Sequence, residues 1–212
     1  MEFTTASFPP DPIIYSTPTW AQLHELTFQV AQQIYQEQSR GLPPFVRIVT
    51  LAKGGWSMTR ALVDFLQVKE VASLGVRFYK GVDQRLEQPE VYQDLPISVK
   101  GERVLLFDDV ADTGESLIFG QDYLRSRGVS DVKTAAVFYK PHSHLKPDFF
   151  GETTSNWIIF PYEIIESMKI ITTRWAGQGA LPERQDLESR FGQLGFTPAQ
   201  IGLFFERYST PS

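Results

Sequence analysis

The feature that most constrains the fold is one stretch, residues 103–117, in which an apolar segment leads into an acidic turn. Four of the five residues from Arg103 to Phe107 are apolar, which predicts a buried parallel strand. Asp108 and Asp109 follow, and residues 112–116 turn the chain into a helix expected to begin near Leu117. Ligands of open α/β sheets bind at the carboxyl ends of strands, and small residues before a helix present N–H groups to a phosphate. The stretch therefore predicts a site for a phosphorylated sugar, with two carboxylates for its hydroxyl groups and a divalent cation.

The remaining chain alternates between helical and strand-like segments, which predicts an α/β fold with a parallel sheet and right-handed crossovers. Residues 1–16 are expected to be an irregular lead-in. Residues 80–100 are polar, contain two prolines and are expected to form a long loop that acts as a lid. Helices are expected over 18–38, 56–66 and 117–127, and strands over 45–51, 71–79, 103–107, 132–139 and 157–160.

The character of the chain changes near residue 171. We expect a sheet domain with an N-terminal helix and a small hood over residues 1–170, and a C-terminal helical extension over residues 171–212. In this extension Leu187, Phe191 and Leu194 share a helical face, and Thr197 with Pro198 is the expected start of another helix. Such a pair of helices can pack on the sheet domain, dock a partner or bind DNA. Four arginines and four acidic residues from residue 171 onward balance, so no basic face supports DNA binding.

Composition narrows the class of protein. A chain of 212 residues can bury one good-sized core, and its formal net charge of −5 gives no attraction to nucleic acid or to an anionic membrane. The absence of cysteine excludes disulfides and thiol catalysis. The N-terminal residues lack the basic and apolar regions of a secretory signal, and the apolar runs are too short to span a bilayer. A cytoplasmic enzyme or binding protein is expected.

Residues 107–117 also resemble a family signature. Phe-Asp-Asp-Val-Ala-Asp-Thr-Gly-Glu-Ser-Leu is similar to the phosphoribosyl-pyrophosphate (PRPP) motif of the type I phosphoribosyltransferases, and every position of that motif is filled. The resemblance covers about residues 18–165. It implies a Rossmann-like parallel sheet flanked by helices, a requirement for Mg²⁺ and a homodimer or homotetramer.

The resemblance assigns roles to the acidic stretch. Asp108 and Asp109 are expected to address the ribose hydroxyls and, indirectly through them or through water, the metal. Asp112 is the expected catalytic base, placed to take the N7 proton of a purine. The residues expected to wrap the 5′-phosphate are Thr113, Gly114, Glu115 (through its backbone N–H) and Ser116.

A second loop follows the first core strand. Lys53 is followed there by Gly54 and Gly55, whose small size permits close approach of a ligand. In the resembled family this position is the pyrophosphate loop, and it sometimes contains a cis peptide. Arg77 and Lys80, at the start of the lid candidate over residues 77–96, are further candidates for pyrophosphate binding.

A third segment is a candidate binding site for the purine base. Lys140 ends one expected strand, and the run Trp-Ile-Ile-Phe-Pro-Tyr-Glu begins at Trp157. An ammonium group can donate to a purine 6-oxo group, and an indole can stack on the ring, unless Trp157 is only a core residue. The pair resembles the base pocket of 6-oxopurine phosphoribosyltransferases, which implies that Ile158 and Glu163 lie near the purine 2-position. His142 and His144, with no further clustered ligand, do not predict a metal site.

The expected reaction is transfer of the phosphoribosyl group from PRPP to hypoxanthine, guanine or xanthine, which gives a nucleoside 5′-monophosphate and pyrophosphate. One alternative is a transferase of the same fold for adenine or a pyrimidine, which Lys140 and Trp157 disfavour. Another is a PRPP-binding regulator without catalysis, which the presence of Asp112, Lys53 and the two glycines disfavours.

Overall fold

The computed structural model describes residues 2–79, 85–179 and 181–208. The chain forms two compact units. The sheet unit consists of Leu23–Ser155, and the terminal unit consists of Met1–Gln22 together with Asn156–Ser212.

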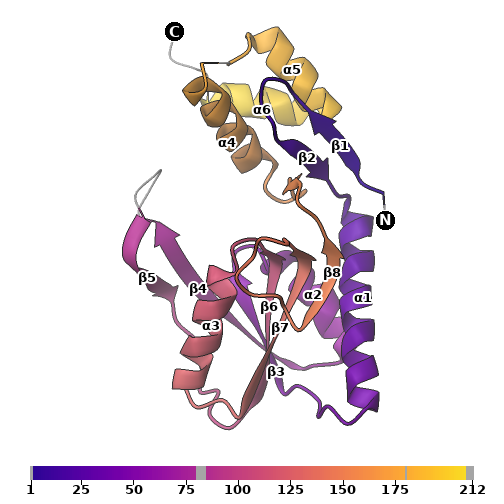
Figure 1. Cartoon of the computed structure of the whole chain (residues 1–212), viewed down its shortest axis with the longest axis vertical. Coiled ribbons are helices and arrows are strands. Elements are labelled where there is room, and N and C mark those ends of the chain that lie inside the picture. The colour runs from indigo at the N-terminus through magenta and orange to yellow at the C-terminus, as the bar shows by residue number, and fades with distance from the viewer. Residues whose placement is uncertain (1, 80–84, 180, 209–212) are drawn as a thin grey trace. The chain divides into compact units, whose positions relative to one another are not determined.

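The sheet unit is built on a six-stranded sheet (Figure 1). Its strands are β3 (Arg47–Ala52), β4 (Glu70–Tyr79), β5 (Arg85–Gln93), β6 (Arg103–Ala111), β7 (Asp131–Tyr139) and β8 (Phe149–Thr153). They lie in the order β5-β4-β3-β6-β7-β8, and every pairing is parallel except that of β5 with β4. Its helices are α1 (Trp20–Ser39, from residue 23 onward), α2 (Trp56–Leu66) and α3 (Glu115–Ser126). The expected parallel sheet flanked by helices is confirmed.

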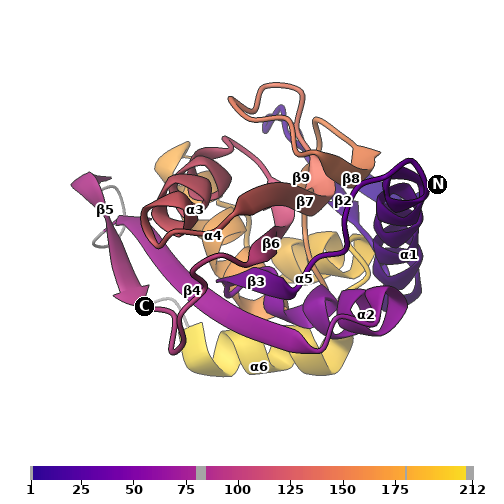
Figure 2. The same ribbon diagram turned by 90° about the horizontal axis from the view of Figure 1, so that it is seen from below.

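The strand order decides where the helices lie. The chain passes from β3 through α2 to β4 in one direction along the sheet, and from β6 through α3 to β7 in the other. Because such crossovers are right-handed, α2 and α3 must cover opposite faces. Figure 2 shows α3 on one face and α1 and α2 on the other. On the α3 side, Leu117 and Leu124 join a core that includes Leu51, Leu74 and Leu106.

Two strands depart from the sequence-based expectation. Residues 85–93 of the expected loop form β5, and β8 was not predicted at all. Both are edge strands, with a neighbour on one side, so neither needs the continuous apolar run of a central strand. The Pro89 that favoured a loop is tolerated in β5 for the same reason. Residues 80–84, the remainder of the expected lid before β5, lie outside the described residues.

The terminal unit joins the two ends of the chain. Its three-stranded sheet consists of β1 (Thr4–Ser7), β2 (Ile14–Thr17) and β9 (Trp157–Ile158), and its helices are α4 (Ile164–Gly177), α5 (Arg184–Gln193) and α6 (Pro198–Tyr208). The expectation of an irregular lead-in was wrong, because β1 and β2 pair as antiparallel strands and β2 pairs with β9. Such pairing between distant segments leaves little trace in the local sequence.

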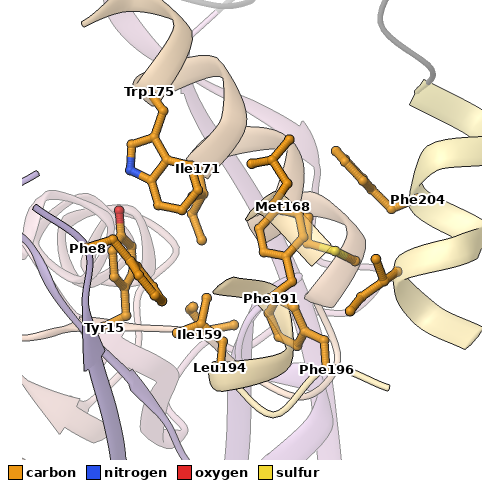
Figure 3. Close-up of a cluster of buried hydrophobic side chains, with 12 residues drawn as sticks. Phe8, Tyr15, Ile159, Met168, Ile171, Trp175, Phe191, Leu194, Phe196 and Phe204 are labelled. Atoms are coloured by element: carbon orange, nitrogen blue, oxygen red, sulfur yellow. The ribbon is translucent and has the colours of Figure 1, made fainter. Parts of the chain in front are cut away.

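The last two helices bury their apolar faces inside the terminal unit. Leu187, Phe191 and Leu194 share a core with Phe8 and Trp175, so the extension packs with α4 and the N-terminal segment (Figure 3). Residue 170, the expected domain boundary, lies within α4. The assignment of residues 171–212 as a separate extension stays a prediction. None of the helices in the described part of the chain is long and apolar enough to cross a membrane.

A buried carboxylate links the N-terminal segment to α4. Asp11, which is 4% exposed, accepts hydrogen bonds from the hydroxyl of Tyr15 at 2.6 Å and from the indole N–H of Trp175 at 3.0 Å. Arg174 and the backbone N–H of Ile13 complete the set at 3.3 and 3.2 Å. Burial raises the pKa of Asp11, but these hydrogen bonds, led by that from Tyr15, lower the pKa by more, so that it lies below its ordinary value.

Candidate active site

The candidate site lies at the carboxyl ends of β3, β6 and β7, which are neighbours in the sheet. The chain leaves β3 toward α2 and leaves β6 toward α3, in opposite directions, so the strand order reverses between these two strands. Ligands of open α/β sheets bind at such a reversal. The two loops singled out in the sequence, after β3 and at the end of β6, therefore flank one position.

The loop after β3 contains a cis peptide bond between Ala52 and Lys53. The side chain of Lys53 is exposed, whereas Gly55 is buried. A Cβ atom on Gly54 would lie 2.5 Å from both carboxylate oxygens of Asp109, so the carboxylate of Asp109 packs directly against this glycine. The backbone N–H of Gly55 hydrogen-bonds the carboxylate of Asp108. The structure thus brings the glycine loop and the acidic pair together.

Asp108 and Asp109 lie on β6 and not in the loop after it. The strand was expected to end at Phe107, but pairing with β7 continues to Ala111. Asp109 is 7% exposed, and its backbone N–H donates to Asp108 Oδ1 at 3.0 Å. Burial and, after it, the neighbouring carboxylate of Asp109 raise the pKa of Asp108 well above its ordinary value.

The turn into α3 has the geometry of an anion site. The helix begins at Glu115, two residues earlier than expected, and Gly114 precedes it with a φ of 82°, a conformation that favours glycine. A Cβ on Gly114 would also lie 2.5 Å from Ser143 Oγ, so this turn packs against the loop after β7. Gly114 supplies no capping side chain, and the N–H of Glu115 makes a long hydrogen bond of 3.4 Å to Thr113 Oγ1, so the positive end of the α3 dipole favours an anion here.

The loop after β7 brings Lys140 to Asp112. Lys140 is 7% exposed, and its backbone N–H donates to the carbonyl of Ala111 at 3.0 Å. Burial lowers the pKa of the Lys140 ammonium, and the negative charge of Asp112 partly offsets this. Asp112 itself is exposed and lies in the loop between β6 and α3.

One residue at the site was missed in the sequence. The His142 Nε2 atom lies 3.0 Å from Asp112 Oδ1. In the sequence, His142 was considered only as a possible metal ligand. The available signal was its place two residues after Lys140, because the loops after adjacent parallel strands meet at the same edge of the sheet.

The other predicted residues are on β4, outside the described residues or in the terminal unit. Arg77 is on β4, where its guanidinium lies 3.8 Å from the carboxylate of Glu90 and over the ring of Tyr92. Lys80 lies outside the described residues. Trp157, Ile158 and Glu163 belong to the terminal unit, where Trp157 packs against Tyr15 with ring centroids 6.3 Å apart and Glu163 precedes α4. A pocket that combines them with Lys140 stays a prediction.

The donors at the site suit Mg²⁺ bound together with a substrate. Within the described residues there is no group of three or more carboxylate, histidine or cysteine side chains that could hold a metal by itself. Mg²⁺ typically keeps several waters and binds through one or two carboxylates and substrate phosphates. Asp108 and Asp109 supply such carboxylates beside the glycine loop, so the residues present fit the ion.

Comparisons with known proteins agree with this geometry. The phosphoribosyl transferase domain family matches residues 19–166. A xanthine-guanine phosphoribosyltransferase of Idiomarina loihiensis is 28% identical over 149 residues, which cover 69% of this chain and 85% of that protein. One of Gluconobacter oxydans is 25% identical over 161 residues, 75% of this chain and 90% of that protein.

Among solved structures, a purine phosphoribosyltransferase from Pyrococcus horikoshii superposes with a TM-score of 0.61 at 26% identity. The match covers 70% of this chain and 93% of that one. Because the family match extends over more than half of the chain and includes the loop after β3, the acidic motif and the loop after β7, this protein belongs to the phosphoribosyltransferase family.

Proposed function

We propose that this phosphoribosyltransferase transfers the 5-phosphoribosyl group of PRPP to a 6-oxopurine, hypoxanthine, guanine or xanthine. The observation that carries the proposal is the packing of the Asp109 carboxylate against Gly54, which joins a sugar-binding acidic motif to a pyrophosphate-binding loop. The names of the relatives, xanthine-guanine phosphoribosyltransferases, support a 6-oxopurine as the acceptor.

Binding of PRPP uses both loops. The N–H groups of residues 113–116 receive the 5′-phosphate at the positive end of the α3 dipole. Glu115 contributes its backbone N–H, since its carboxylate must point away from a phosphate. Lys53, Gly54 and Gly55 hold the pyrophosphate group, where the absence of side chains at 54 and 55 permits close approach.

The chemical step is a displacement at C1 of the ribose. The bond between C1 and the pyrophosphate oxygen breaks ahead of full attack, which leaves positive charge on the ring and negative charge on the leaving group. Asp108 and Asp109 hold the ribose hydroxyls, while Lys53 faces the departing pyrophosphate. Mg²⁺, when bound with Asp108 and Asp109 nearby, supplies positive charge to neutralise the pyrophosphate.

The acceptor purine attacks through N9 and loses its N7 proton. Asp112, at the edge of the site beside Lys140, takes this proton as a general base. The Lys140 ammonium donates to the 6-oxo oxygen, a contact that an adenine amino group cannot accept. Trp157 stacks on the base, and Ile158 and Glu163 lie near its 2-position.

A direct assay tests the proposal. The protein is incubated with PRPP, Mg²⁺ and one base at a time, and the nucleotide formed is separated and quantified. We expect product with hypoxanthine, guanine or xanthine and none with adenine or uracil. Asp112→Asn should lower kcat by roughly 10²-fold or more, the usual scale for a general base, while the KM for PRPP stays within twofold.

Two results would overturn it. Product from adenine or uracil alone would assign another base to the same fold. Binding of PRPP by calorimetry without product from any base would identify a PRPP-binding regulator. Assembly into a homodimer or homotetramer and action in the cytoplasm belong to the same proposal, and light scattering on the purified protein measures the first of these.

A further inference from the structure

The loop after β7 is hydrogen-bonded to the loop that contains Asp112. The backbone N–H of Lys140 donates to the carbonyl of Ala111 at 3.0 Å, and the backbone N–H of His144 donates to the carbonyl of Thr113 at 2.9 Å. These two hydrogen bonds flank Asp112 on one loop and His142 on the other. The backbone on both sides of each side chain is therefore held in place.

Hydrogen bonds within the loop after β7 form a turn that stabilises its conformation. The N–H of Ser143 donates to the carbonyl of Lys140 at 2.9 Å, and Ser143 Oγ donates to the carbonyl of Leu145 at the same distance. Ser143 also packs against Gly114, where a Cβ would lie 2.5 Å from its Oγ atom. Residues 140–145 thus form a fixed support for residues 111–114.

Between the flanking backbone bonds, His142 Nε2 meets Asp112 Oδ1 at 3.0 Å. The two side chains are 59% and 61% exposed. A pair this exposed contributes only about 0–1 kcal/mol to folding, because water competes for both groups. A role in stability therefore does not account for the pair, whereas a role in aiming the carboxylate does.

We propose that His142 is a positioning residue for Asp112, an inference that rests on the proposed function. His142 donates from Nε2 to Oδ1 and restricts rotation of the Asp112 side chain. The other oxygen, Oδ2, is then aimed at the N7 proton of the purine. An exposed aspartate without this partner would sample several orientations, and only a fraction of them would be productive.

Kinetics of three variants test the role. His142→Ala should lower kcat by about three- to fivefold, which corresponds to the upper end of the range for an exposed pair, while the KM for PRPP is unchanged. His142→Gln should restore most of the loss, because its amide nitrogen can occupy a place close to Nε2. His144→Ala is the matched control, since this neighbouring histidine is exposed and contributes its backbone to the loop.

A second measurement does not depend on turnover. The chain has three histidines, so the ring nitrogens can be assigned by ¹⁵N NMR with single variants. Asp112→Ala should shift the His142 ring resonances and leave those of His24 and His144 in place. Thermal unfolding of each variant establishes that it is folded.

The outcomes separate this inference from the proposed function. A shift at His142 together with a loss of kcat that glutamine restores supports the positioning role. An unmoved His142 resonance, or a kcat for His142→Ala equal to that of His144→Ala, overturns it. If the His142 resonance shifts but the wild-type protein makes no nucleotide, the contact stands and the proposed function fails.

Discussion

The packing of Asp109 against Gly54 makes Gly54→Ala an informative change. The added Cβ would lie 2.5 Å from both carboxylate oxygens, whereas ordinary contacts begin at 3.4 Å, so the carboxylate must move by about 0.9 Å (3.4 − 2.5). The obstacle is the end of a side chain and not backbone, so the fold can accommodate it at a cost of about 1 kcal/mol in unfolding free energy. A displacement of this size in a positioned group lowers kcat/KM on the order of 10²-fold, or about 2.7 kcal/mol.

The same change at the neighbouring Gly55 should lower the unfolding free energy more than Gly54→Ala does. A Cβ on Gly55 would lie 2.5 Å from Thr50 Oγ1 and also 2.9 Å from the carbonyl oxygen of Phe107 and 3.1 Å from that of Leu51. Backbone atoms within β3 and β6 cannot rotate away. Gly55→Ala should therefore lower the unfolding free energy by about 2–3 kcal/mol, and the Tm by about 4–12 °C for a chain of this size.

The assay compares kcat/KM for PRPP with the midpoint of thermal unfolding. Gly192→Ala is the control, because it makes the same chemical change in α5 where a Cβ would meet nothing within 4 Å. Its activity should stay at the wild-type level. None of these three glycines has a positive φ, so backbone strain does not confuse the comparison.

Wild-type kcat/KM in Gly54→Ala would contradict this prediction, since the carboxylate of Asp109 would then not need its observed position. A loss of activity in Gly54→Ala that is only proportional to a loss of folded protein would also contradict it. Equal losses of Tm in the two loop variants would show that side-chain and backbone obstacles are not distinguished at this site.

Three further predictions concern the rest of the chain. Hydrogen bonds hold the pKa of Asp11 below its ordinary value, so the stability that they provide is present at neutral pH and is lost as pH falls through that lowered pKa. The urea midpoint of the wild type should therefore drop at acid pH, and that of Asp11→Asn should change less. Lys140→Ala should raise the KM for 6-oxopurines by roughly 10- to 100-fold, equivalent to about 1–3 kcal/mol, in steady-state assays. Phe191→Ala, at a fully buried ring, should cost about 3–5 kcal/mol in chemical denaturation, whereas Leu203→Ala, at a side chain 42% exposed, should cost under about 1 kcal/mol.

The central strands could be predicted from the sequence because each one carries its own signal. The strands β3, β6 and β7 are covered on both faces, so each contains a run of apolar residues that can be recognised in the local sequence. The strands β5 and β8 could not be found in this way, since an edge strand depends on its one neighbour for pairing. The same holds for β2, whose Tyr15 pairs with Trp157 far along the chain.

In the candidate site, the individual segments could be predicted from the sequence, but the contacts between them could not. Lys53 with its glycines and the acidic motif each lie within one short segment, so a local pattern indicates them. The contacts of Gly54 with Asp109 and of Asp112 with His142 join separate segments, the latter 30 residues apart, and no local pattern encodes them. They follow from the strand order, because the loops after adjacent parallel strands meet at the same edge.

The three carboxylates of the acidic motif are held in place in different ways, depending on where they lie relative to β6. Asp108 and Asp109 lie inside the strand, where pairing with β7 fixes the backbone, and the carboxylate of Asp109 packs against the loop after β3. Asp112 lies beyond the last paired residue, Ala111, so its placement depends on the loop that begins at Lys140. Apart from His144→Ala, which removes only an exposed side chain, substitutions in residues 141–145 should consequently change turnover and choice of base more than they change the affinity for PRPP. Substitutions that disturb the glycine loop should have the reverse effect, because in the proposed function the donor and the acceptor are held by different parts of the same edge.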